Sequence, residues 1–490
     1  MYKPNYELTK MLAESEQYGV IPISKEIFLD IITPVELLKI LQNVSNNCFM
    51  LESIKDTKQT GRYTFLGFNP LLELVCRNRK MKIKSIVENE FETTNPSSYI
   101  QKIIDENKSP YFDYLPTFTG GFVGYFSYDY IKYSEPKLKL LADDVEEFND
   151  VDLMLFDKVI AFDNLKKNIV IIVNVKTDNI SDEYERGIKE IEYLENLIKN
   201  GVAKNNKSGR LISEFKTLFT KDEYCEMVNK AKNHITEGDI FQVVLSNKIE
   251  AEYEGNLLNI YCILRKTNPS PYMFYFANDS IEIAGASPET LVKLDGENLY
   301  TFPLAGTRPR GINHKMDLEL ERELLSDEKE LAEHNMLVDL GRNDLGKVSR
   351  FGTVNVEKYL SIKKFSHVMH IGSVVSSKLQ DDKSAMDVLS AVLPAGTLSG
   401  APKIRACEII DQLENDKRGV YGGAIGYLDF KGNLDTCIAI RAAYKKNGKI
   451  FIRSGAGIVA DSIPEKEYQE CIDKAKAVVK AIELAQGGVV

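Results

Sequence analysis

The sequence predicts an α+β protein in which large antiparallel sheets are covered by helices. Two turn pairs, Asp295-Gly296 and Asn447-Gly448, each lie between strand-like runs, TLVKL and LYTFPL for the first and IAIRAAY and KIFIRSG for the second. Long amphipathic segments with helix caps alternate with these hairpins. Because the strands join as hairpins and not as repeated strand–helix–strand units, antiparallel sheets are favoured over a doubly wound parallel sheet.

The first part of the chain, to about residue 176, mixes strand-like runs with turns. These runs are CFMLESI (48–54), RYTFLGF (62–68), GGFVGYFSYDYI (120–131) and IVIIVNV (169–175). A helix is expected next, capped by Ser181, with Asp182 and Glu183 in the first turn where the helix dipole favours negative charge. Its apolar face consists of Ile188, Ile191, Leu194, Leu197 and Ile198, and Gly201 ends it.

A polar segment, GVAKNNKSGR (201–210), is predicted to be a linker or exposed loop. After it, Thr220 and Glu223 form the capping box of a new helix. Helices are expected near 220–236, 327–341, 384–393, 401–413 and 464–485. The predicted organisation is therefore an N-terminal region (1–176), a helix and linker (177–218) and a C-terminal region (219–490).

The composition excludes several classes of protein. The chain has 490 residues, of which 43% are hydrophobic and 27% charged, with a net charge of −10. This acidic balance, without basic runs, argues against a nucleic-acid or anionic-membrane binder. The apolar runs have strand length and are too short to span a bilayer, and the N-terminus MYKPNYELTK shows no signal region. The seven cysteines show no CxxC spacing, so a reducing cytoplasm is the expected location.

One glycine-rich loop, PAGTLSGAPKIRA (394–406), superficially suggests a phosphate-binding site. Gly396 and Gly400 are separated by three residues, and no hydroxyl residue follows Lys403. The spacing of a nucleotide-binding loop is therefore not met, and a nucleotide site is not favoured.

Two of the expected helices carry paired carboxylates. Asp327 can cap the first with Glu330, which places Glu330 and Glu333 one turn apart on one face. Ser462 can cap the second with Glu465, and the face of that helix carries Glu467, Glu470 and Lys474. Two such pairs suit a hard cation such as magnesium. Spacing alone favours the simpler alternative, two solvated faces with a Glu470–Lys474 ion pair, and leaves both open.

The histidines are few. In FSHVMHIGSVV, which is predicted to be a strand, His367 and His370 would point to opposite faces, and periodicity does not say which of them could serve as a base. The glycine-rich pieces PLAGTRPRG (303–311) and RSGAG (453–457) can bring backbone amides close to a ligand, although glycine also serves in turns.

Taken in order, several motifs resemble one enzyme family. GASPE (285–289), PLAGTRPRG, ELAEHNMLVDLGRND (330–344), PAGTLSGAPK, YGGAIGY (421–427), SGAG and EYQECIDKAK follow one another along the chain. This set resembles the chorismate-binding enzymes, which form anthranilate, aminodeoxychorismate, isochorismate or salicylate. The resemblance is dense over about 219–486 and thinner in the first half, through LES and GRYTFLG. It implies a layered α/β sandwich of large antiparallel sheets and a chorismate-binding catalytic region at 219–490.

The resemblance also implies how a dianionic substrate is held. Mg²⁺ would bridge the ring carboxylate of chorismate to Glu333 and Glu470, with Glu330 and Glu467 helping through water. The residues that would hold chorismate are Gly306, Thr307, Tyr421, Arg441, Gly455, Ala456, Gly457 and Lys474. Arg441 and the glycine amides suit the enolpyruvyl carboxylate, Thr397 would line the same pocket, and Lys403 is expected to be structural.

Within the family, the branch that forms anthranilate fits best. Glu289 matches the acid that helps the C4 hydroxyl leave, and it must be protonated to act. Gln242 stands where water-activating members have a lysine, so ammonia is the better nucleophile. Ala305 replaces the nucleophilic lysine of one type of aminodeoxychorismate-forming enzyme. His370 matches the residue tied to pyruvate elimination, while His334 and His367 are expected to be structural.

The resemblance further implies regulation and a partner. Glu52 and Ser53 in the N-terminal region, with Pro271, Tyr272 and Met273 of NPSPYMF, resemble a tryptophan inhibitor site, as expected for the first step of tryptophan biosynthesis. No cysteine lies in a Gly-x-Cys-x-Gly context, so a separate glutamine amidotransferase subunit would supply ammonia in a hetero-oligomer. Two alternatives stay open: an aminodeoxychorismate-forming enzyme, and a catalytically silent, tryptophan-binding regulatory subunit.

Overall fold

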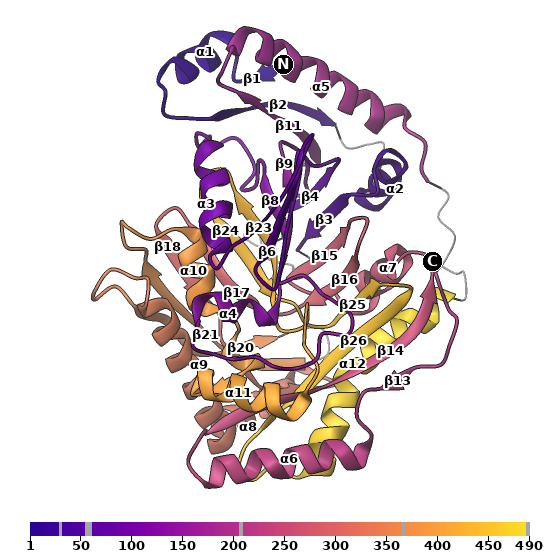
Figure 1. Ribbon diagram of the computed structural model, residues 1–490, viewed down its shortest axis with the longest axis vertical. Helices are drawn as coiled ribbons and strands as arrows, with labels where there is room; N and C mark the ends of the chain where they lie inside the picture. Colours follow the sequence, from indigo (N-terminus) through magenta and orange to yellow (C-terminus); the bar gives the residue numbers. More distant parts are fainter. Residues whose placement is uncertain (29–31, 54–60, 205–208, 365–367, 487–490) are drawn as a thin grey trace.

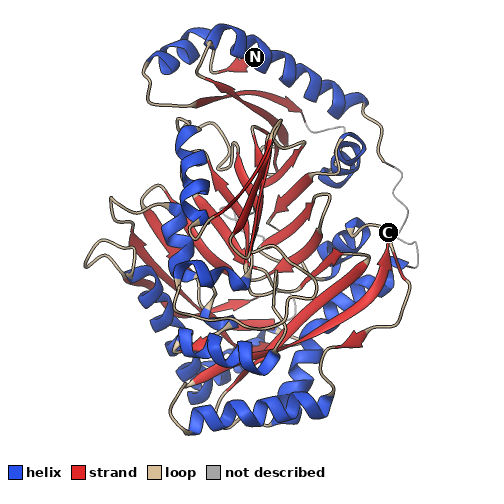
Figure 2. Cartoon of the chain, viewed as in Figure 1, coloured by secondary structure: helices blue, strands red, loops and turns tan. Residues whose placement is uncertain are grey.

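Two large antiparallel sheets form the centre of the molecule, and helices cover their outer faces (Figure 1). This computed structural model describes residues 1–490 except 29–31, 54–60, 205–208, 365–367 and 487–490. Neighbouring strands run antiparallel, as in the long pairs β14–β26 and β20–β21. The predicted α+β sandwich of antiparallel sheets is confirmed (Figure 2).

Among the described residues, the first sheet has 14 strands and the second has 12. In spatial order the first contains β1 (Tyr2–Lys3), β2 (Val20–Phe28), β11 (Asn168–Lys176), β10 (Lys158–Asp163), β4 (Tyr63–Phe68), β3 (Cys48–Glu52), β15 (Tyr272–Ala277), β16 (Glu282–Ser287), β25 (Ala442–Lys446), β26 (Lys449–Ile458), β14 (Gln242–Glu254) and β12 (Arg210–Leu211), with β13 (Lys216–Thr217) and β22 (Gly400–Ala401) also paired to β14. The second contains β19 (Leu304–Pro309), β21 (Val368–Lys378), β18 (Asn298–Thr301), β17 (Thr290–Asp295), β24 (Leu434–Ile438), β23 (Ala424–Asp429), β8 (Gly121–Phe126), β9 (Val151–Phe156), β5 (Leu72–Arg77), β6 (Lys80–Lys84) and β7 (Glu88–Glu92), with β20 (Asn355–Lys364) paired to β21.

The helices connect and cover the strands. They are α1 (Tyr6–Glu14), α2 (Pro34–Val44), α3 (Pro96–Glu106), η1 (Tyr128–Tyr130), α4 (Ile131–Ser134), α5 (Ile180–Asn200), α6 (Lys221–Thr236), α7 (Leu258–Thr267), α8 (His314–Ser326), α9 (Glu328–Gly346), α10 (Ala385–Val392), η2 (Gly396–Leu398), α11 (Lys403–Glu414) and α12 (Pro464–Gln486). The part of the chain that the structure describes contains no helix with the length and hydropathy that a membrane span requires.

Strands from both halves of the sequence share each sheet. In the first, β3 pairs with β15, and in the second, β8 pairs with β23. One hydrophobic core fills the space between the sheets, with Phe49 and Phe274 from the first packing with Phe122 and Leu428 from the second. A second core lies between the outer face of the 14-stranded sheet and helices that include α5 and α12. Burial on this scale is the main favourable free energy of the fold.

Local sequence signals explain many of these elements. Both residues of the Asn447-Gly448 pair have positive φ, 51° and 75°, as a two-residue type I′ hairpin requires, and Lys446 pairs with Lys449 across it. The other predicted hairpin also forms, with Lys293 to Asp295 paired to Asn298 to Tyr300, but its two-residue turn is Gly296-Glu297, one position later than the predicted Asp295-Gly296. The Thr220–Glu223 capping box is present at the start of α6.

Three other local predictions were wrong. Helix α5 starts after Asn179, in the left-handed region at φ 53°, so Ser181 lies inside the helix and does not cap it. Helix α12 starts at Pro464, and the hydroxyl of Ser462 instead accepts a hydrogen bond from the backbone N–H of Val459. The predicted strand 120–131 ends at Phe126, because the N–H of Ser127 bonds to Asp150 and the chain then turns into η1 and α4.

Candidate active site

The proposed acid, Glu289, lies in the short connection between β16 and β17. The hydroxyl of Thr397, on η2, donates a hydrogen bond to its Oε1 at 3.1 Å. Burial raises the pKa of Glu289 to about 7, against the lowering effects of this hydrogen bond and of the positive charges of Arg441 and Lys474. A carboxyl with such a pKa can hold a proton near neutral pH and donate it.

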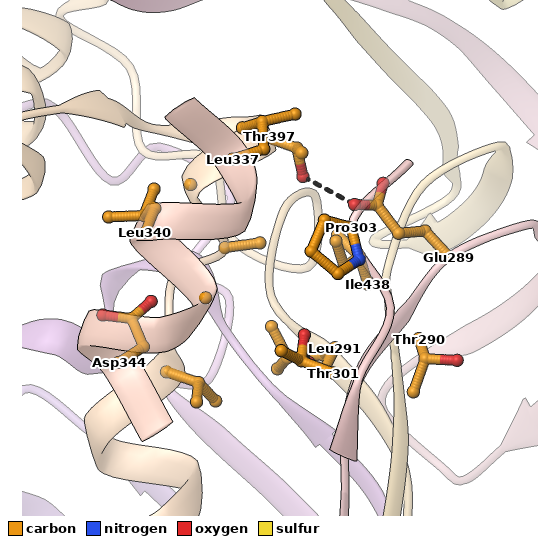
Figure 3. A pocket seen from close by; sticks show the side chains of 14 residues that line it. Glu289, Thr290, Leu291, Thr301, Pro303, Leu337, Leu340, Asp344, Thr397 and Ile438 are labelled. Carbon is orange, nitrogen blue, oxygen red and sulfur yellow. Dashed lines mark hydrogen bonds between the residues drawn. The ribbon is translucent and has the colours of Figure 1, made fainter. Parts of the chain in front are cut away.

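A small cavity opens beside this pair. Its volume is about 50 Å³, which is room for about four water-sized molecules. Figure 3 shows the Thr397–Glu289 hydrogen bond at one end of the cavity and Asp344 of α9 at the other. The other predicted substrate residues lie outside this cavity, which is too small for chorismate.

Arg441 faces Glu289 from the loop between β24 and β25. Its backbone is in the left-handed region at φ 50°, and its carbonyl accepts a hydrogen bond from the N–H of Ala286 at 3.1 Å. Burial lowers the pKa of the guanidinium, while the Glu289 charge opposes that shift. Within the described residues, no hydrogen bond or ion pair engages this guanidinium, which suits an anion supplied by a ligand.

The predicted glycine-rich segment 455–457 lies at the end of β26 and pairs with residues 244–246 of β14. A Cβ on Gly455 would come within 2.6 Å of the carbonyl oxygen of Leu245 and 3.1 Å of the Tyr421 hydroxyl, so only glycine fits there. The ammonium of Lys474 donates to the carbonyl oxygen of Gly455 at 3.0 Å. The structure therefore brings Tyr421, Lys474 and this strand end together, and Ala456 is fully buried within it.

His370 lies on β21 next to the predicted residues of β19. Its Nδ1 is 2.8 Å from the carbonyl oxygen of Gly306 and 3.1 Å from the hydroxyl of Thr307. Because a carbonyl can only accept, Nδ1 carries the proton and Nε2 is the basic nitrogen. Gly306 has φ 65°, and a Cβ there would come within 3.1 Å of the Glu330 carboxylate. His367 lies outside the described residues.

Two other polar residues near the site bond to partners within the protein. His334 is fully buried, bonds through Nε2 to the hydroxyl of Ser373 at 2.7 Å, and has its pKa lowered to about 4 by burial. Lys403 forms a buried ion pair with Asp344 at 2.7 Å. Both observations agree with the structural roles expected from the sequence.

The two acidic helical faces are electrostatically coupled. Burial, then the carboxylates of Glu330 and Glu470, raise the pKa of Glu333. Burial and Glu470 also raise the pKa of Glu467. A carboxylate on α9 and one on α12 thus interact closely enough to repel each other, although the predicted Glu470–Lys474 ion pair, 2.7 Å, also forms.

The donor set of these faces fits a hard divalent cation. All four predicted ligands are carboxylates, and no hydrogen bond or ion pair engages Glu333 within the described residues. No three of the four place oxygens within 4.8 Å of one another, so a cation retaining several waters fits better than a tight all-protein cage. Among described residues, the one such tight group is His234, Glu237 and Asp239, where Asp239 is already paired with Arg405 at 2.8 Å.

Sequence reasoning missed one cation at this site. Arg308, within the quoted PLAGTRPRG, forms ion pairs with Asp327 at 2.8 Å, Glu323 at 3.0 Å and Glu330 at 3.2 Å. It joins β19 to the start of α9 and holds one of the predicted metal ligands. Its position within a glycine-rich ligand loop was the available signal.

The predicted inhibitor residues also come together. Glu52, at the end of β3, pairs with Met273 of β15, and Pro271 and Tyr272 precede Met273 at that strand end. The buried Glu52 carboxylate accepts hydrogen bonds from the hydroxyl of Tyr261 and from Nε of Arg265, the latter at 2.7 Å. Ser53 follows Glu52 and is partly buried.

Comparisons with known proteins agree with this geometry. The chain is 44% identical over 495 residues to anthranilate synthase component 1 of Acetivibrio thermocellus, with 99% of each chain covered. It is 44% identical to the same component of Aquifex aeolicus, with 98% of each covered. The crystal structure of anthranilate synthase component I from Streptococcus pneumoniae matches with a TM-score of 0.75 and 35% identity, covering 92% of this chain and 98% of that one. The family model described as chorismate binding enzyme matches residues 46–480, and the chain belongs to this family.

Proposed function

We propose that this chain converts chorismate and ammonia into anthranilate and pyruvate, the first step of tryptophan biosynthesis. The observation that carries the proposal is the pairing of a protonatable acid, Glu289, with the unengaged guanidinium of Arg441. The relatives of the chain that are named anthranilate synthase component 1 support the same reaction.

In the first half-reaction, ammonia adds at C2 of the ring while the C4 hydroxyl leaves. Glu289 gives its proton to that hydroxyl, which departs as water, and Thr397 orients the carboxyl through its hydrogen bond. Arg441 and the amides of the β26 strand end hold the enolpyruvyl carboxylate. Gln242, buried at the start of β14 beside Gly457, carries an amide that cannot activate water as a base, which favours ammonia.

In the second half-reaction, Nε2 of His370 removes the proton from C2. The C–H electron pair forms the last ring double bond as the C3–O bond breaks, so the ring becomes aromatic. The enolpyruvate that leaves takes up a proton at its methylene carbon and becomes pyruvate. The hydrogen bond from Nδ1 to the Gly306 carbonyl fixes the tautomer that this role needs.

A magnesium ion is the proposed cofactor. Glu333 and Glu470 would hold it, with Glu330 and Glu467 acting through water, and Lys474 and Arg308 would limit the excess negative charge. When bound, the ion supplies positive charge that fixes and neutralises the ring carboxylate of the substrate.

Partner, regulation and location form a second part of the proposal. A separate glutamine amidotransferase subunit would supply ammonia, because none of the seven cysteines lies in a nucleophile-elbow sequence. Tryptophan would bind at Glu52, Ser53 and the strand end Pro271 to Met273 and inhibit the enzyme. The cysteines are all free thiols, which supports a reducing cytoplasm.

A product assay tests the function. The purified chain with chorismate, Mg²⁺ and an ammonium salt should release anthranilate, detected by fluorescence, and pyruvate in equal amounts. Accumulation of aminodeoxychorismate without pyruvate would establish the competing amination reaction instead. Tryptophan binding without any turnover of chorismate would establish a silent regulatory subunit.

A further inference from the structure

Three side chains next to Glu289 form a hydrogen-bonded chain that joins the two sheets. The hydroxyl of Thr290 donates to the phenol oxygen of Tyr272 at 3.0 Å. That phenol donates in turn to the carboxylate of Asp435 at 2.8 Å. Tyr272 belongs to β15 of the first sheet, whereas Thr290 and Asp435 belong to β17 and β24 of the second. One tyrosine therefore bridges the sandwich beside the proposed acid.

The backbone at this point is not fixed by a regular ladder. Thr290 pairs with Cys437, but the next pairing is Val292 with Thr436, so the register shifts by one residue directly after Thr290, at Leu291. Such bulges re-aim side chains and leave a residue without its ladder partner. Thr290 is thus the last paired residue before the irregularity, and its hydrogen bond to Tyr272 fixes it at a second point there.

Tyr272 is also connected to the residues that precede Glu289. Its backbone pairs with Ser287, and the Ser287 hydroxyl bonds to the N–H of Glu289 at 3.3 Å. The carbonyl of Glu289 accepts a third contact, from the N–H of Ile438 at 3.0 Å. Residues before and after Glu289 are therefore both attached to Tyr272.

We infer that Tyr272 is a positioning residue for Glu289, holding the acid through Thr290 with its phenol anchored by Asp435. This inference rests on the proposed role of Glu289. Tyr272 touches neither the substrate groups nor the cavity, so it acts only through its neighbours. Its loss should reduce the rate of proton donation and leave chorismate binding nearly intact, because the groups assigned to binding lie elsewhere.

Tyr272→Phe removes only the hydroxyl. We expect kcat to fall about tenfold, as a small misplacement of a catalytic group does, with the KM for chorismate changed by less than about twofold. The alkaline limb of the kcat profile should also move, because the charges facing Glu289, those of Arg441 and Lys474, would lie at altered distances.

Tyr275→Phe is the matched control. Tyr275 lies on the same strand and donates to a buried carboxylate, that of Glu282, while accepting from the amide of Gln42 at 2.8 Å. It contacts neither Thr290 nor Glu289, so its substitution removes a comparable buried hydrogen bond without touching the acid. Its kcat and pH profile should match those of the parent.

Thr290→Val completes the test. It should lower kcat as Tyr272→Phe does. The double variant should be no slower than the slower single variant, because both substitutions remove the same hydrogen bond between Thr290 and Tyr272. Equal kcat values for Tyr272→Phe and Tyr275→Phe, or multiplying effects in the double variant, would overturn the inference. Turnover is followed as chorismate consumed and anthranilate formed separately. If the parent consumes chorismate without forming anthranilate, the proposed function fails, yet the variants still decide the role of Tyr272.

Discussion

Two regions of the molecule bury glutamates and treat them in opposite ways. Glu414 is fully buried, yet its pKa is lowered, because Arg418 and Arg453 and the N–H and hydroxyl of Ser246 surround its carboxylate. Glu333 is less buried, and its pKa is raised by burial and by the carboxylates of Glu330 and Glu470. Positive groups and hydrogen-bond donors therefore stabilise the ionised form of Glu414, whereas burial and neighbouring negative charges destabilise the ionised form of Glu333.

This difference distinguishes a carboxylate that stabilises the fold from one that can bind a cation. A buried carboxylate with arginine and amide partners is satisfied within the protein and has no capacity left for a ligand. A carboxylate held against other carboxylates destabilises the empty protein and gains most from an added cation. Glu289 and Arg441 follow the same logic, since each charge only partly offsets the burial of the other, and Thr397 adds a hydrogen bond to Glu289 alone.

The largest fall in kcat is expected for Glu289→Gln, which tests a carboxyl whose ionised form is disfavoured by burial. The amide can keep the Thr397 hydrogen bond but cannot donate the proton, so kcat should fall by about 10²–10⁴-fold with chorismate binding retained. In the parent, an acid with a pKa of about 7 is active when protonated, so kcat should decline as the pH rises above about 7. Steady-state kinetics across pH measures both effects, and a variant that keeps the parental rate would refute the acid role.

Glu333→Gln is expected to come next, with a loss of magnesium-dependent turnover of about 10²–10³-fold. The same change should not lower thermal stability without magnesium, because it relieves repulsion from two neighbouring carboxylates. Glu328→Gln, an exposed residue in the first turn of the same helix, is the control and should keep the parental rate. Equal turnover in both variants would exclude Glu333 as a ligand.

The smallest effect on chemistry and a clear effect on stability are expected for Glu414→Gln. Neutralising Glu414 leaves the buried Arg418 without its carboxylate partner, while Arg453 keeps its ion pair with Asp416, and should cost about 3–5 kcal/mol of unfolding free energy, measured with denaturant. Since the folded pKa of Glu414 is lowered, its stabilisation is present above the unfolded value and is lost as the pH falls through the folded one. An unfolding free energy of Glu414→Gln equal to that of the parent would contradict the stabilising role of Glu414.

Sequence reasoning succeeded where chemistry is local. The Asn447-Gly448 turn and the Thr220 capping box depend on residues within four positions, and both formed as predicted. The two acidic faces were also readable from helical spacing, although spacing alone could not show that they interact. The resemblance to a family, and not periodicity, selected His370 over His367.

The remaining features depend on contacts between distant segments. Tyr272 and Asp435 are 163 positions apart and meet only because two sheets pack together. Arg308 acquires its role from the start of α9, which the spacing of its own loop does not reveal. The Ser181 cap failed because Asn179 adopts a left-handed conformation two residues earlier, which asparagine tolerates but does not require.

The central claim is that mutually repelling carboxylates on α9 and α12 make the binding of a small diacid depend on a divalent cation. Calorimetric titration of a non-reacting chorismate analogue into the protein, with and without Mg²⁺, tests this directly. We predict measurable binding only when Mg²⁺ is present, and none for Glu333→Gln under either condition. Equal affinity for the analogue with and without Mg²⁺ would contradict the account.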